Sequence, residues 1–271
     1  METTTRSSDG TVLAYRSHGS GPGLVVVPGS TRRAHHYDAL ASALAETVSV
    51  HVVERRGRGA SGPQGPAYGL DREVEDVLAV LDATGSTALF GHSYGGLVAL
   101  ETARVRTVAT LIVYEPSAGL SARLDTGFTG PLADALARGR YATAMARLIS
   151  GLGLARMPAP LTGAVCWLMM RGREGAVLRE TIRTVPAEIQ AGLSLDPDLA
   201  RYAAITARTL LLGGERSPQW LRSVLTDLDR TMPGAALVMA PRLDHNAPDQ
   251  DGPDVIAGLV RAFLAPERAV S

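Results

Sequence analysis

The sequence contains no lysine: all 27 of its basic residues are arginine. Without lysine the chain cannot form a Schiff base, supply the lysine of a phosphate-binding loop or use a serine–lysine pair. The arginines are balanced by 27 acidic residues, so the formal net charge is zero and no basic stripe stands out. Because nucleic-acid binding requires an excess of positive charge on one face, we expect no nucleic-acid partner.

Cysteine and long apolar runs are scarce as well. The single Cys166 excludes an intramolecular disulfide and a cysteine-based metal cluster, and its apolar surroundings predict a small core residue. No apolar run reaches the roughly 18 residues of a membrane span. The polar segment 1–10 lacks the apolar core of a signal peptide. We therefore expect a cytoplasmic protein with no membrane partner. We also expect no cofactor or metal, a small molecule as the substrate, and a homodimer as a possible assembly.

Strand and helix patterns alternate along most of the chain. Residues 11–16 alternate in the manner of an early antiparallel strand, and strands are also predicted at 24–27, 48–53, 87–90, 111–114, 209–212 and 236–239. Helical spacing predicts helices at 34–45, 71–83 with Asp71 as the cap, 97–104, 219–228 and 255–264. This alternation predicts an α/β fold, with a mainly parallel sheet flanked by helices.

The interval from about 117 to 207 breaks the alternation. It is rich in Ala, Leu, Arg and Met at helical spacing and contains no convincing strand. We expect a helical insertion over one edge of the sheet, placed before the last two strands. The predicted organisation is a core made of residues 1–116 and 208–271, interrupted by an insertion of residues 117–207.

Residues 91–95, with the sequence GHSYG, match the pattern Gly-x-Ser-x-Gly. The pattern is short and common, but here it follows a predicted strand directly and precedes a predicted helix. A strand–turn–helix of this kind holds a serine on a strained turn with its Oγ exposed at the carboxyl end of the sheet. Glycines are needed because a Cβ on either side would collide with neighbouring backbone. The setting predicts that Ser93 is a nucleophile.

A serine hydroxyl is a poor nucleophile until a base takes its proton. In this architecture the chain order is serine, acid, histidine. His245 is the only histidine downstream of Ser93, and it lies in the loop after the predicted strand 236–239. His245 is therefore the predicted base.

The acid that would orient His245 has several candidates. Glu115 follows the predicted strand 111–114 and has no obvious packing role, and its length would help it reach across one strand. Glu215 lies after the next strand and is the second candidate. Asp244 is the weakest, because adjacent side chains rarely face each other. We favour Glu115 and keep the other two open.

Backbone amides are the expected donors of an oxyanion hole. One is the amide of Tyr94, the residue after the nucleophile, and the other comes from the loop after the strand 24–27. Pro28 has no N–H, so Ser30 is the favoured second donor. The hydroxyl of Ser30 either assists or caps the helix that follows.

With these residues in place, the chain resembles the α/β-hydrolase family over nearly its whole length. The resemblance rests on Pro28-Gly29, on RRGRGASG at 55–62, on GHSYGG at 91–96 and on His245. Two positions depart from the family pattern: Pro28 replaces the usual histidine, and Ser217 stands where a late aspartate is usual. An acid after the earlier strand is similar to zearalenone-type lactone hydrolases and, as Asp, to polyketide synthase thioesterases.

The resemblance implies that the insertion 117–207 is a lid over the nucleophile. Apolar lid residues could line a hydrophobic pocket, Trp167 among them, although packing onto the core is the favoured explanation for any one of them. The implied function is a serine hydrolase that cleaves an ester or lactone of a hydrophobic small molecule through an acyl-enzyme on Ser93.

Three alternatives remain open at this stage. The same site would suit an acyl thioesterase or a cyclising enzyme of a biosynthetic pathway. A non-hydrolytic enzyme of this fold is a second alternative, weakened because hydroxynitrile lyases of the fold commonly use a lysine. A small-molecule receptor that has kept only the pocket is the third.

Overall fold

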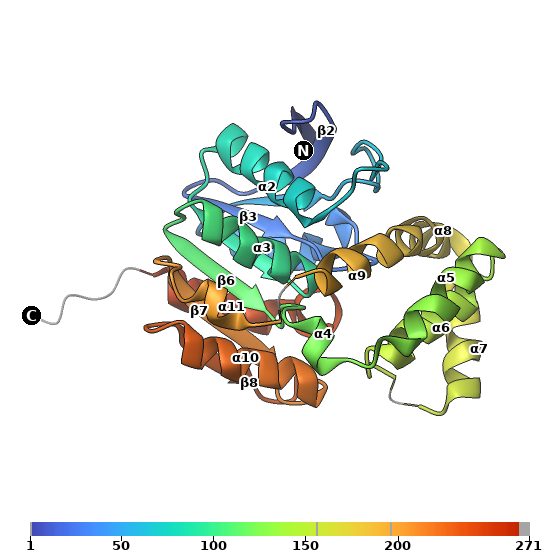
Figure 1. The fold of residues 1–271 in the computed structure, drawn as a ribbon. Helices are drawn as coiled ribbons and strands as arrows, with labels where there is room; N and C mark the ends of the chain where they lie inside the picture. The colour runs from blue at the N-terminus through green and yellow to red at the C-terminus, as the bar shows by residue number, and fades with distance from the viewer. Residues whose placement is uncertain (1, 156, 196, 266–271) are drawn as a thin grey trace, which may run out of the picture.

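A single sheet runs through the computed structural model, which describes residues 2–155, 157–195 and 197–265 (Figure 1). Within these residues the sheet has eight strands in the order β1-β2-β4-β3-β5-β6-β7-β8. The pairs β1–β2 and β2–β4 are antiparallel, and all other neighbours are parallel, which confirms the predicted fold class. The strands are β1 (Glu2–Arg6), β2 (Val12–His18), β3 (Gly23–Val27), β4 (Ser49–Glu54), β5 (Ala88–His92), β6 (Thr110–Tyr114), β7 (Arg208–Gly214) and β8 (Ala236–Ala240).

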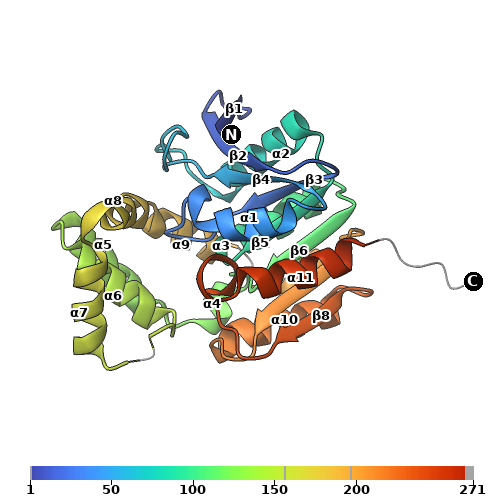
Figure 2. The same cartoon turned by 180° about the vertical axis from the view of Figure 1, so that it is seen from behind.

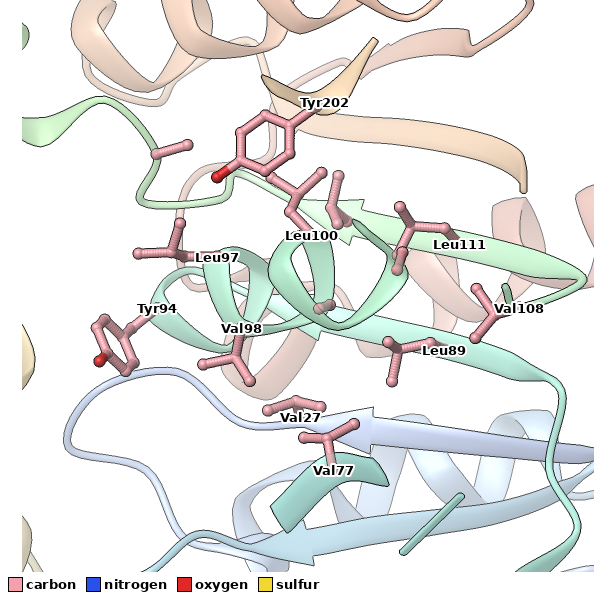
Figure 3. Packing of buried hydrophobic residues seen from close by; sticks show 14 of the residues in the cluster. Val27, Val77, Leu89, Tyr94, Leu97, Val98, Leu100, Val108, Leu111 and Tyr202 are labelled. Carbon is pink, nitrogen blue, oxygen red and sulfur yellow. The ribbon is translucent and has the colours of Figure 1, made fainter. Parts of the chain in front are cut away.

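Helices cover both faces of this sheet. One face carries α2 (Leu70–Thr84), α3 (Tyr94–Val105) and α10 (Gln219–Thr231), and the other carries α1 (Asp38–Leu44) and α11 (Pro253–Leu264) (Figures 1 and 2). Each face buries its own apolar cluster. In the first cluster Val27 and Leu89 of the central strands pack near Val98 of α3 (Figure 3). Burial on both faces explains why the central strands are continuous apolar runs.

Between β6 and β7 the described residues form helices only. Most of them lie beyond the carboxyl ends of the parallel strands (Figure 1), and the chain then returns along the sheet face that carries α3 and α10, where Leu199 and Tyr202 join the first apolar cluster. The helices are α4 (Leu120–Arg123), η2 (Thr126–Phe128), α5 (Thr129–Ala137), α6 (Tyr141–Gly151), α7 (Ala159–Met169), α8 (Gly172–Thr181), η3 (Ile182–Thr184), α9 (Val185–Leu193) and η4 (Leu199–Tyr202). Part of this insertion has a separate small core, to which Met145, Leu148 and the buried Cys166 belong. No helix in the described part of the chain is long and apolar enough to cross a membrane.

Three local features differ from the sequence expectations. β1 has mostly exposed, polar side chains and pairs along the edge of the sheet through its backbone, so no apolar pattern signals it. The helix α2 begins at Leu70 with Gly69 as its N-cap, so the predicted cap at Asp71 is wrong. Asp71 lies in the first helical turn, where its charge complements the helix dipole. α3 begins at Tyr94, three residues before the predicted start.

The turn between β5 and α3 has no room for side chains on its glycines. A Cβ on Gly91 would lie 2.4 Å from the carbonyl oxygen of Gly95, and one on Gly95 would lie 2.2 Å from that of Val27. Both obstacles are backbone atoms, which cannot turn aside. The predicted need for glycine on both sides of Ser93 is thus confirmed.

The substitution Gly95→Ala is expected to destabilise the protein by about 3 kcal/mol or more, because backbone must shift to admit the methyl group. Gly258→Ala is the matched control, since a Cβ at this position in α11 meets nothing within 4 Å. The control should be neutral or stabilising by up to ~1 kcal/mol, because alanine favours a helix. Urea unfolding followed by circular dichroism measures both changes, and equal stabilities for the two variants would contradict this account.

Candidate active site

Ser93 occupies the strained turn at the end of β5. Its backbone has φ +56° and ψ −121°, a region that residues other than glycine rarely adopt. Neighbouring backbone holds it there: the Ser93 amide donates to the carbonyl of Tyr114 at 2.9 Å, and the Ser93 carbonyl accepts from the amide of Ser117 at 3.0 Å. These contacts tie the turn to the end of β6, so the side chain projects at the carboxyl edge of the sheet.

Ser93, His245 and Glu115 form one hydrogen-bonded line. His245 Nε2 lies 3.1 Å from Ser93 Oγ, and His245 Nδ1 lies 2.7 Å from Glu115 Oε2. A carboxylate accepts, so the ring donates its Nδ1–H to Glu115, and its Nε2 is left as the acceptor for the serine hydroxyl. The structure therefore brings together the predicted nucleophile, base and favoured acid.

Glu115 is completely buried and bridges three parts of the sheet edge. It follows β6, its Oε1 accepts from the amide of Gly214 at the end of β7 at 2.7 Å, and its Oε2 reaches the loop after β8. The Glu115 backbone also has a positive φ, +46°. Its carboxylate therefore spans the strand that separates β6 from β8.

The two other acid candidates lie elsewhere. Glu215 is exposed to solvent. Asp244 accepts a hydrogen bond from the amide of Asn246 at 2.8 Å. Ser217, which stands where the family resemblance suggests an aspartate, is buried, and its hydroxyl has no hydrogen-bond partner among the described residues. Of these positions, only Glu115 is bonded to the imidazole.

Of the two residues predicted to supply oxyanion donors, Tyr94 follows Ser93 in the chain and Ser30 lines the same cavity as Ser93. Tyr94 is the first residue of α3, so its amide has no acceptor within the helix. In the loop after β3 the amide of Gly29 already donates to Tyr37 Oη at 3.0 Å, which leaves Ser30 as the next N–H along the loop. The Ser30 hydroxyl does not cap the following helix; it donates to Glu188 at 2.6 Å.

A cavity of about 220 Å³ opens beside Ser93 and His245. Helices of the insertion supply one apolar side, and the loops after β3 and β8 supply a polar side. The apolar lining consists of Met145, Leu148, Ile149, Leu152, Leu154, Met169 and Leu178, and the polar lining includes Ser30, Thr31, Arg32, Asn246 and Gln250.

Trp167, the predicted substrate-binding residue, is not part of this lining. Its side chain is 55% exposed, and the guanidinium of Arg171 lies 3.5 Å from the centre of its ring. Leu168 is exposed on the same helix, whereas Met169 lines the cavity. Met170 is buried in the small core of the insertion, so the apolar run 167–170 divides between the surface, the site and that core.

His92, the residue directly before Ser93, has no role that the sequence pattern predicts. Its Nδ1 accepts from Tyr37 Oη at 2.7 Å, and its Nε2 donates to the carbonyl of His245 at 2.8 Å. Through Tyr37 this chain of bonds continues to the amide of Gly29. It links the loop of the candidate oxyanion hole to the loop that carries His245. The sequence signal was the histidine inside GHSYG, but its partners lie far away along the chain.

Complete burial lowers the pKa of His92 from its usual 6.5 to about 3. A neutral ring fits the observed pattern, in which one nitrogen accepts and the other donates. A charged group does lie nearby: Asp249 Oδ1 is 3.8 Å from His92 Nδ1. Asp249 is itself buried and paired with Arg32 at the cavity wall, so the two charges offset each other.

One cluster has the composition of a metal site. His35 and His36 of η1 (Ala34–Tyr37) each place Nε2 3.4 Å from Oε2 of Glu174 in α8. However, His36 Nδ1 accepts from the amide of Arg33 at 2.8 Å, so the proton of the neutral ring resides on Nε2. A metal needs a free lone pair at that nitrogen. The cluster therefore fits a hydrogen-bonded contact between η1 and α8.

Stability is expected to fall as the pH is lowered from about 6.5 towards 3. In this window the unfolded chain protonates His92 and the folded chain does not, which costs up to about 1.4 kcal/mol per pH unit. Urea unfolding of the wild type and of His92→Gln between pH 6.5 and 5 measures the effect, because carboxylates with lowered pKa values contribute only below that range.

Between pH 6.5 and 5 the free energy of unfolding should fall less steeply in His92→Gln than in the wild type. His36→Gln is the control for His36, a partly buried ring whose pKa burial lowers to about 4. Parallel stability curves for the wild type and His92→Gln would show that His92 is not held neutral.

The family model described as the alpha/beta hydrolase family matches residues 24–259. An alpha/beta hydrolase from Sphaerobacter thermophilus is 29% identical, with 97% of this chain and 100% of that chain covered and a TM-score of 0.82. An esterase from Exiguobacterium antarcticum is 21% identical (97% and 99% covered, TM-score 0.72). An enol-lactonase from Burkholderia xenovorans is 20% identical (97% and 99% covered, TM-score 0.75). No curated protein sequence matches the chain significantly.

Proposed function

The chain belongs to the alpha/beta hydrolase family, and from this membership we propose that it is a serine hydrolase that cleaves a carboxylic ester or lactone of a small, uncharged, hydrophobic molecule. The observation that carries the proposal is the line of hydrogen bonds from Ser93 through His245 to Glu115, with a cavity beside Ser93 and His245. Solved esterase and lactonase structures of similar fold are consistent with it.

In the proposed reaction His245 Nε2 takes the proton of Ser93 Oγ as the oxygen attacks the carbonyl carbon. The amides of Ser30 and Tyr94 bind the oxyanion of the tetrahedral intermediate. His245 then gives the proton to the leaving alcohol oxygen, which leaves an acyl group on Ser93. A water molecule then gives a proton to His245 and attacks the acyl carbon. As the bond from that carbon to Ser93 Oγ breaks, His245 returns the proton to Oγ and the acid leaves. Glu115 keeps Nδ1–H in place and stabilises the imidazolium in both steps.

The cavity favours small substrates. Its volume of about 220 Å³ lies below the ~300–1,000 Å³ of sites for drug-sized ligands. Its apolar wall suits a short alkyl or ring group. Arg32 is the one permanently charged residue of the described lining, and its pairing with Asp249 leaves no surplus charge for an anionic substrate.

The substitution Ser93→Ala is expected to lower kcat for short aryl esters by several orders of magnitude. The amides of Ser30 and Tyr94 remain and should leave roughly 10³–10⁴-fold acceleration over water. A fluorophosphonate should label Ser93 in the wild type and not in the variant. Wild-type turnover by Ser93→Ala would rule out the proposal, and an unreactive Ser93 would favour a receptor.

The roles of the carboxylates separate in a matched pair of variants. Glu115→Gln should lower kcat by about 10⁴-fold, because an amide in this position stabilises the wrong histidine tautomer. Glu215→Gln, the same change on an exposed side chain, should retain wild-type kcat. The opposite result, with activity lost in Glu215→Gln only, would assign the acid to Glu215.

Acyl-chain preference tests the proposed size limit. In a series of p-nitrophenyl esters, kcat/KM should be highest for short acyl chains and should fall steeply once the chain exceeds the cavity. The corresponding thioesters serve as a parallel series for the thioesterase alternative. Equal kcat/KM for acetate and laurate esters would exclude the cavity as the acyl-binding site.

A further inference from the structure

Arg58, which lies in the loop after β4, holds the loop after β3, residues 29–32. The guanidinium of Arg58 is completely buried, and its Nη1 donates to the carbonyls of Gly29 at 2.9 Å and Arg32 at 2.8 Å. Between these two points Thr31 has φ +59°. A residue other than glycine keeps such a conformation only where surrounding contacts impose it. The shape of the loop therefore depends on its buried neighbours.

Glu188 in α9 of the helical insertion is the second anchor of the loop. Its Oε2 accepts the hydroxyl hydrogen of Ser30 at 2.6 Å, and its Oε1 accepts from Thr184 Oγ1 at 2.7 Å and from Arg58. Arg55 Nη2 lies 3.4 Å from the same Oε1. Although burial alone would raise it, the two arginines lower the pKa of Glu188 to about 2, so the carboxylate stays charged.

These contacts make Glu188 a fixed point. Its side chain is only 1% exposed, and turning it towards water would take from the buried guanidinium of Arg58 the carboxylate with which it is paired. A hydroxyl bonded to a fixed, charged acceptor is itself fixed. The amide of Ser30 belongs to the same residue as that hydroxyl, so its direction is set by the same bond.

We infer that Glu188 is a positioning residue for the oxyanion hole: it holds the Ser30 hydroxyl and thereby aims the Ser30 amide at the developing oxyanion. The inference rests on the proposed function, in which this amide binds the oxyanion. It gives the insertion a part in the chemical step in addition to its lining of the cavity. A displaced amide weakens binding of the transition state more than binding of the substrate, so the effect belongs in kcat.

The test is Ser30→Ala, which removes the hydroxyl and keeps the amide. We expect kcat to fall about 10-fold while KM stays within about 2-fold, because only part of the stabilisation by one oxyanion donor is lost. A trifluoromethyl ketone, which forms a tetrahedral adduct with Ser93, should lose affinity by the same factor as kcat/KM. Ser30→Thr, which restores a hydroxyl, should recover most of kcat.

Ser8→Ala is the matched control. Ser8 Oγ also donates to a glutamate, Glu75, at 2.5 Å, but this pair lies on the exposed surface away from the cavity. Its kcat and its inhibitor affinity should equal those of the wild type. Glu188→Gln should lose at least as much kcat as Ser30→Ala. The double variant should lose no more than Glu188→Gln alone, because both substitutions disrupt the same hydrogen bond, from Ser30 to Glu188.

Two kinds of outcome overturn the inference. If Ser93→Ala is inactive but Ser30→Ala keeps wild-type kcat and inhibitor affinity, or if the losses in the double variant are additive, Glu188 does not act through Ser30. The proposed function then still stands. If the wild type neither hydrolyses esters nor reacts with a fluorophosphonate, the proposed function fails, and this inference fails with it. Even where Glu188→Gln does not fold, wild-type kcat and inhibitor affinity in Ser30→Ala overturn the inference.

Discussion

A buried carboxylate joins the ends of neighbouring strands, and the rest of the candidate site depends on it. Glu115 has no exposed surface, and each of its oxygens accepts a hydrogen bond, one from the amide of Gly214 and one from the ring of His245. Removing a charge from water is costly unless it is fully bonded, so the carboxylate has little freedom to move. Glu115 therefore fixes the orientation of the His245 ring, so that Nε2 is the nitrogen that faces Ser93.

The surrounding loops are tied to this centre by buried polar side chains. Neutral His92 connects the loop after β3 with the carbonyl of His245, through Tyr37. Arg58 and Glu188 hold the same loop through the carbonyl of Gly29 and the hydroxyl of Ser30, and Glu188 belongs to the insertion. The insertion and the sheet core thus share one network of charges.

Local rules were sufficient for much of the fold and for part of the site. The apolar runs of the central strands and the glycines beside Ser93 depend on residues that are adjacent in the chain, and both were predicted correctly. The edge strand β1 was missed because a polar strand that pairs by its backbone has no apolar signature. The residue type of Asp71 predicts a cap, but the observed cap, Gly69, lies two residues earlier.

The sequence by itself determined the fold class, the strained turn at Ser93 and the one downstream histidine, because these follow from periodicity, glycine sterics and chain order. Only the tertiary structure decided which carboxylate meets His245. Glu115 and His245 are 130 positions apart. They meet because the sheet order places the end of β6 only one strand, β7, away from the end of β8. The same holds for the exposure of Trp167 and for the bond from Ser30 to Glu188, 158 positions away. Such contacts depend on how separate helices, strands and loops pack together, and local sequence patterns do not predict that packing.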